Sequence, residues 1–173
     1  MPTFTPQGAG SWRNADGLIV YFNTREGTAG QGGEYKTYGP WREQEVLIDM
    51  STLTTSAQFL DQHFELPKGA YIESVQLETL VAATSSGSGT FSLGLKQSDQ
   101  STNISDTALI NAATTASITT VGTQITYVAG TTGAGANIGT ALGFNGLFTA
   151  KVSAVYQAGR IAVRVRYNFL PLT

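Results

Sequence analysis

Apolar and polar residues alternate in several segments of this chain, with the period of two that is typical of β-strands with one buried face. The clearest segments are residues 70–81, 91–95 and 161–169. In the first, one face carries Val75, Leu77, Thr79 and Val81. In the last, one face carries Ile161, Val163, Val165, Tyr167 and Phe169. A slip of one residue would bury the polar residues of this last strand, so its register is firmly set.

The remaining segments predict further short elements. Residues 46–48 and 57–66 are strand candidates, and the β-branched residues of segment 115–128 predict one or two more strands. Residues 107–113 are the best helical candidate, with Ser105 or Asp106 as the cap. Residues 157–160 predict a hairpin turn, with Gly159 where a positive φ is needed. Short strands, frequent turns and at most one short helix predict an all-β fold, an antiparallel β-sandwich of jelly-roll type.

The first 44 residues differ from the rest of the chain. A glycine-rich stretch at residues 27–33 lies among large aromatic residues, which include both tryptophans. This composition favours an extended arm that docks on another surface, because aromatic residues dominate interface anchors. The alternative is that residues 17–22 form a first strand and the tryptophans close the core. We therefore expect an arm over residues 1–44 and a sandwich domain over residues 45–173, with the partner-binding candidates Trp12, Tyr35, Tyr38 and Trp41.

Charge is scarce. Charged residues make up 13% of the 173-residue chain, about half of ordinary usage, and residues 81–150 contain only Lys96, Asp99 and Asp106. We interpret this stretch as β-structure that something other than water covers. The net charge of −2 excludes the basic footprint of a nucleic-acid-binding protein. The one basic cluster, Arg160, Arg164 and Arg166, alternates with apolar residues and is typical of an ordinary polar strand face.

Catalytic chemistry is nearly absent. The chain has no cysteine, and its one histidine, His63, follows Asp61 by two positions without a nucleophile motif nearby. Residues 98–106 offer oxygen ligands for calcium but lack the spacing of a calcium-binding loop. The glycines of segment 130–139 predict a turn or contact loop, because no Lys-Ser/Thr follows them. We expect no enzyme, no cofactor and no metal.

The segment at residues 1–6 has neither the basic nor the apolar region of a signal peptide, and no apolar run approaches the roughly 20 residues that span a bilayer. We therefore expect a soluble protein of a cytoplasm-like compartment that does not bind a membrane.

One resemblance to a known family rests on three segments. Residues 64–75 read FELPKGAYIESV, residues 91–95 read FSLGL, and residues 159–167 read GRIAVRVRY. Together they resemble small β-sandwich virion proteins of tailed bacteriophages, the cement or decoration proteins of the capsid and some related fibre and tail proteins. The resemblance covers residues 64–168 and leaves the arm without a counterpart. It implies a structural role on or between major capsid subunits, in a virion assembled in the host cytoplasm.

With this resemblance we expect homo-oligomers, trimers in preference to dimers, that bury the low-charge strands at subunit contacts. The aromatic arm would then bind the capsid lattice. The alternative function is carbohydrate binding by a β-sandwich of a phage fibre or tail. A protein with that function would carry a platform of exposed aromatic rings on which a sugar stacks. The candidates for these rings are Tyr71, Tyr127 and Tyr156.

Overall fold

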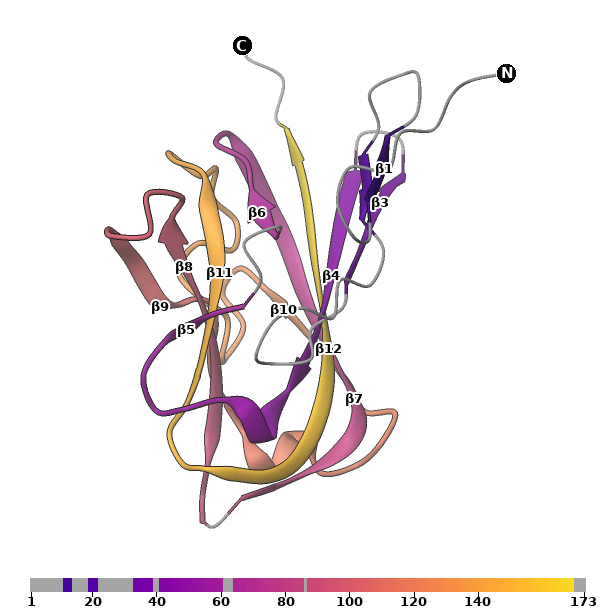
Figure 1. The fold of residues 1–173 in the computed structure, drawn as a ribbon, viewed down its shortest axis with the longest axis vertical. Coiled ribbons are helices and arrows are strands. Elements are labelled where there is room, and N and C mark those ends of the chain that lie inside the picture. The colour runs from indigo at the N-terminus through magenta and orange to yellow at the C-terminus, as the bar shows by residue number, and fades with distance from the viewer. Residues whose placement is uncertain are drawn as a thin grey trace.

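The computed structural model describes residues 11–13, 19–21, 33–38, 41–60, 64–85 and 87–169. Most of these residues form two antiparallel sheets that pack face to face (Figure 1). The first sheet has the strand order β10-β7-β12-β4-β3, and the second has the order β5-β11-β8-β9, with β6 also paired to β11. A separate two-stranded sheet joins β1 and β2.

The strands have the following bounds. Those of the first sheet are β3 (Gly33–Tyr38), β4 (Trp41–Asp49), β7 (Ala70–Ser85), β10 (Gln124–Val128) and β12 (Tyr156–Phe169). Those of the second sheet are β5 (Gln58–Phe59), β6 (Glu65–Leu66), β8 (Thr90–Gln97), β9 (Asn103–Thr114) and β11 (Gly146–Val152). The small sheet consists of β1 (Ser11–Arg13) and β2 (Ile19–Tyr21).

The order in which the chain visits the two sheets is that of a jelly roll. From β4 onward the chain crosses to β5 and β6, returns to β7, crosses to β8 and β9, returns to β10, crosses to β11 and ends in β12. Apart from the consecutive pairs β3–β4 and β8–β9, neighbouring strands within each sheet are distant in sequence, as in a double Greek key. The predicted antiparallel sandwich of jelly-roll type is confirmed.

The core lies between the sheets and contains the faces that the alternation predicts. Its fully buried side chains include Ile48, Leu77, Phe91, Leu93, Leu95, Phe148, Ile161, Val163, Val165 and Tyr167. Two residues of the predicted buried faces are exposed, Val81 (47%) and Phe169 (41%), and Phe169 is the last residue of β12. The pairing of β7 with β12 shifts between Arg160 and Ile161, and this irregularity turns Val81 outward.

The helix predicted over residues 107–113 is wrong, because these residues belong to β9. Leu109 and Ile110 are fully buried, and Ile110 pairs with Leu93 of β8. Burial between neighbouring elements therefore outweighs the helix propensity of the alanines and leucine. The helical turns in the described residues are two short 3-10 helices, η1 (Met50–Thr52) and η2 (Thr115–Ile118).

The hairpin turn predicted at residues 157–160 is also wrong. The chain leaves β11 at Val152 and enters β12 at Tyr156, and these two strands belong to different sheets. Gly159 has a positive φ of 138°, but it lies within β12, at an irregularity of the pairing with β7. A Cβ there would lie 2.9 Å from Ala83 Cα, so Gly159 allows a close crossing of strands. The single strand predicted over residues 57–66 is likewise two short strands, β5 and β6.

The central strands of the second sheet are buried on both faces. In β8, Ser92 is 5% exposed and Gly94 is buried, and in β11 Thr149 is 1% exposed. A Cβ at Gly94 would lie 2.5 Å from the carbonyl oxygen of Ser105, so β9 crosses directly over this position. The chain itself therefore covers these low-charge strands, and they need no sibling subunit as a cover.

The connection between β10 and β11, residues 130–145, binds both sheets. Its hydrogen bonds to β9 run from Asn111 N to Gly133 O (2.8 Å), from Gly135 N to Leu109 O (3.1 Å) and from Asn137 N to Ala108 O (3.0 Å). Those to β7 run from Gly139 N to Ile72 O (2.7 Å) and from Leu142 N to Ala70 O (2.9 Å). The glycine-rich stretch is a loop, as predicted, and it closes one side of the sandwich.

Candidate interaction surfaces

The four predicted partner-binding residues come from three strands. Trp12 lies in β1, Tyr35 and Tyr38 lie in β3, and Trp41 begins β4. In the register of β3 with β4, Tyr38 pairs with Trp41 and Tyr35 pairs with Gln44. The structure therefore brings three of the four residues onto adjacent strands of the first sheet, whereas Trp12 lies in the small sheet.

Trp41 already has a partner within the sandwich. The guanidinium carbon of Arg166 lies 5.1 Å from the centre of the indole ring, a cation–π contact. The Nε of the same arginine lies 3.4 Å from Glu73 Oε2. Trp41 also begins a strand that runs across the expected boundary between residues 44 and 45. A cut after residue 44 would consequently remove part of the first sheet.

The outer face of the first sheet is a network of paired charges. Arg164 Nε lies 2.5 Å from Glu45 Oε2, and its Nη1 lies 2.7 Å from Glu78 Oε2. Burial disfavours the charged form of Arg164, but the hydrogen bonds to both glutamates outweigh this effect and raise its pKa. This guanidinium is thus neutralised by its neighbours. The interpretation of the arginine cluster as an ordinary polar strand face agrees with this geometry.

The carboxylates of Asp99 and Asp106 in the candidate calcium loop already have hydrogen-bond donors within the protein. Asp99 Oδ1 accepts hydrogen bonds from the backbone N–H groups of Ser101 (2.9 Å) and Thr102 (3.0 Å), and these bonds lower its pKa to about 2. Asp106 Oδ2 accepts a hydrogen bond from Lys151 Nζ at 3.1 Å, which is the main reason for its lowered pKa. In the described part of the chain, no group of three or more histidine, cysteine, aspartate or glutamate residues could hold a metal ion.

Two further predictions from the sequence concern the Asp61–His63 pair and the tyrosine platform. Asp61 and His63 lie outside the described residues. The platform of three exposed tyrosines is wrong, because Tyr127 is 4% exposed and Tyr156 is 1% exposed, which leaves only the half-buried Tyr71. Burial raises the pKa of both phenols, and the Tyr156 hydroxyl lies 2.9 Å from Thr115 Oγ1. Buried rings cannot stack on a sugar.

Sequence reasoning missed an uncharged end of the sandwich. Four segments of connections and adjoining strand ends meet there, at the lower end in Figure 1: residues 50–57, residues 80–85 with 87–89, residues 114–123 and residues 153–158. Hydrogen bonds join them: Thr115 N donates to Gly89 O (2.9 Å), and Ser153 N donates to Thr90 O (2.9 Å), at the start of β8. We call these four segments the charge-free end, because none contains Asp, Glu, Lys, Arg or His.

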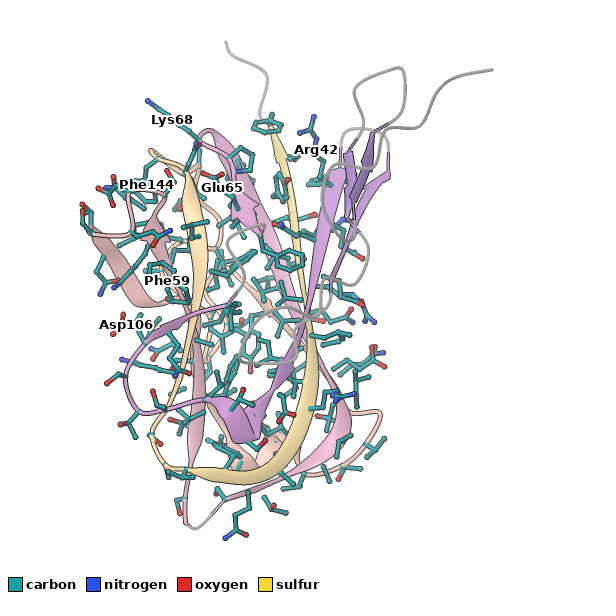
Figure 2. All side chains as sticks on the ribbon, in the orientation of Figure 1. Arg42, Phe59, Glu65, Lys68, Asp106 and Phe144 are labelled. Carbon is teal, nitrogen blue, oxygen red and sulfur yellow. The ribbon has the colours of Figure 1, made fainter. Side chains whose placement is uncertain are left out.

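The opposite end of the sandwich has a different character. Figure 2 shows Arg42, Glu65 and Lys68 there, and Lys68 N donates a hydrogen bond to Asn145 Oδ1 (2.7 Å). The guanidinium carbon of Arg42 lies 4.7 Å from the centre of the Phe169 ring. Charge thus lies at one end of the molecule, on the outer face of the first sheet and at the Lys151–Asp106 ion pair of the second sheet, whereas the four segments at the other end carry none.

Among the described residues, no helix is long and apolar enough to cross a membrane.

The sequence matches no protein-family model and no curated protein sequence. Three solved structures contain similar chains. A chain in the capsid of Ralstonia phage GP4 is 13% identical, with a TM-score of 0.51 over 79% of this chain and 89% of that one. A chain in the acidic stable capsid structure of Helicobacter pylori bacteriophage KHP30 is 16% identical, with a TM-score of 0.48 over 82% and 94% of the two chains. A chain in the capsid asymmetric unit of cyanophage Pam1 is 21% identical, with a TM-score of 0.47 over 84% and 89%.

At this identity the likeness to the phage GP4 chain shows a common fold. The shared fold covers 89% of that chain. The resemblance to β-sandwich proteins of phage virions is confirmed at the level of the fold, and it is a resemblance to chains of phage capsid structures.

Proposed function

We propose that this chain is a virion structural protein that binds the assembled capsid lattice and stabilises it, in a cement or decoration role without catalysis. The observation that carries this proposal is the jelly-roll sandwich, which a chain in a phage capsid shares over 89% of its length. Two features agree with a structural role: the chain has few charged residues, and Arg164 on the outer face of the first sheet forms salt bridges with Glu45 and Glu78.

In this proposal the partner is the major capsid protein, and the chain itself forms homo-oligomers, trimers in preference to dimers. The virion assembles in the host cytoplasm. The protein binds the assembled lattice and not its free subunits, so it stabilises the particle by mass action. The aromatic residues Trp12, Tyr35, Tyr38 and Trp41 are the proposed anchors, because large aromatic side chains supply much of the energy of interfaces.

The test uses empty phage capsids that lack this protein. Purified full-length chain is added at micromolar concentration, and co-sedimentation and the temperature of capsid disruption are measured. We expect saturable binding and a higher disruption temperature. Absence of binding together with an unchanged disruption temperature would contradict the proposed function.

The anchors are tested in the same assay with Trp12→Ala and Trp41→Ala. Each variant should weaken capsid binding about tenfold or more, as loss of an aromatic interface anchor does. The matched control is Phe59→Ala, which removes a half-buried aromatic ring from the second sheet. Equal binding by wild type and both tryptophan variants would contradict the anchor assignment and leave the capsid role intact.

A further inference from the structure

The charge-free end combines lack of charge with exposed apolar side chains. The large hydrophobic side chains exposed there are Leu80 (36%), Val81 (47%), Val121 (62%) and Val155 (59%). In the described residues only two other large hydrophobic side chains are exposed, Val128 and Phe169. Exposed apolar side chains that gather at one place, with no charge between them, are typical of an interaction surface.

We propose that copies of this chain contact one another through the charge-free end. In an oligomer with closed symmetry, the residues nearest the symmetry axis lie close to the same residues of the neighbouring copies, so any charge near the axis meets a like charge. The four segments of the charge-free end carry no charged side chain, and the charges at its edge, Asp49 and Arg160, lie opposite each other in the register of β4 with β12, where Asp49 also accepts a hydrogen bond from Ser51 N (3.0 Å). The cores of protein interfaces are depleted of charge for a related reason, the cost of removing ions from water.

The other surfaces of the sandwich suit self-contact less well. The outer face of the first sheet carries Glu43, Glu45, Glu73 and Glu78 against Arg164 and Arg166, so a copy placed on this face would meet an excess of carboxylates. The opposite end of the molecule carries Arg42, Glu65 and Lys68 (Figure 2). Arg160 pairs in register with Val81 and forms a charged rim beside the charge-free end.

This surface is also separate from the proposed capsid anchors. β1 and β3 lie at the other end of the sandwich in Figure 1. One copy can therefore bind a sibling at one end and the lattice near the other. The inference deepens the proposed function by naming the surface of self-association, and self-association is measured on the isolated protein, apart from capsid binding.

The test measures self-association of full-length protein by sedimentation velocity over a range of concentrations. Val121→Asp and Val155→Asp place a charge on two different connections of the charge-free end, at side chains exposed enough to leave the fold unchanged. We expect each variant to raise the dissociation constant of the oligomer about tenfold or more. The matched control, Val128→Asp, places the same charge on an exposed valine of β10 and should associate like wild type.

A mixing experiment tests whether the contact joins equivalent ends. Val121→Asp and Val121→Lys should each associate weakly alone, and an equimolar mixture should associate more strongly than either. Wild-type protein that stays monomeric at every concentration would overturn the inference. The inference would also be overturned if the control Val128→Asp weakened self-association as much as Val121→Asp does. Loss of capsid binding by Val121→Asp with unchanged self-association would overturn it too, and would assign this end to the lattice.

Discussion

Gly94 lies in the middle of β8, and its lack of a side chain leaves room for the backbone of β9. A Cβ at this position would lie 2.5 Å from Ser105 O and 2.6 Å from Asp106 Cα. Both neighbours are backbone atoms, so they cannot give way as the end of a flexible side chain can. The sequence shows this glycine as one polar-face residue of an alternating strand, and the need for it arises only from the crossing of β9.

We expect Gly94→Ala to lower the free energy of unfolding by about 1–3 kcal/mol, because it overpacks a site closed by backbone. Urea unfolding followed by fluorescence measures the change. Gly87→Ala is the control, since a Cβ there meets no atom within 4 Å, and it should change stability by less than about 0.5 kcal/mol. Similar stabilities for the two variants would show that β9 does not cross Gly94 closely.

At the scale of elements, Arg164 connects three strands of the first sheet. It lies on β12, and its two salt-bridge partners Glu45 and Glu78 lie on β4 and β7. The three side chains are between 20% and 26% exposed, so solvent screens the pairs only in part. Alternation alone predicted that Arg164 faces outward. Its partners could not be predicted, because strand order in a jelly roll brings together residues that are far apart in sequence.

Arg164→Met should lower the free energy of unfolding by about 1–3 kcal/mol, because it leaves two half-buried carboxylates close together without their cation. Thermal and urea unfolding at neutral pH measure the loss. Arg160→Met on the same strand is the control, since Arg160 is exposed and should tolerate the change within about 0.5 kcal/mol. If both variants are equally stable, the network contributes nothing to stability.

For the whole molecule, the connection at residues 130–145 decides whether the two sheets stay joined on one side. It hydrogen-bonds to Ala108 and Leu109 of β9 and to Ala70 and Ile72 of β7. A Cβ at Gly135 would lie 2.2 Å from the carbonyl carbon of Ala108. Composition predicted a loop here, and only the fold shows that the loop closes the sandwich.

Gly135→Val should separate the connection from β9 and thereby weaken its contacts with β7 as well. Hydrogen exchange should become faster at Asn111 and Asn137 on one side and at Ile72 and Leu142 on the other, because all four amides donate to bonds of this connection. Gly143→Val is the control within the same connection, where a Cβ meets no atom within 4 Å. Faster exchange only on the β9 side would contradict a joint closure.

For the candidate interaction surfaces too, the sequence predicted some features and only the fold shows the others. The aromatic residues of the arm stand out in the sequence by type alone, but the pairing of Tyr38 with Trp41 and the contact of Trp41 with Arg166 appear only in the structure. The charge-free end has a partial signal in the sequence, the low charge of residues 81–150. Two of its four segments, residues 50–57 and 153–158, lie outside that stretch, so only the fold assembles the surface.

By itself the sequence determined the fold class and the buried faces of the main strands, because alternation with a period of two reflects local backbone geometry. It also determined the shortage of charge. The tertiary structure alone decided that residues 107–113 extend as part of β9 and that β11 and β12 lie in different sheets. These outcomes depend on contacts between residues far apart in the chain, and local propensity is too weak to oppose the burial that such contacts provide.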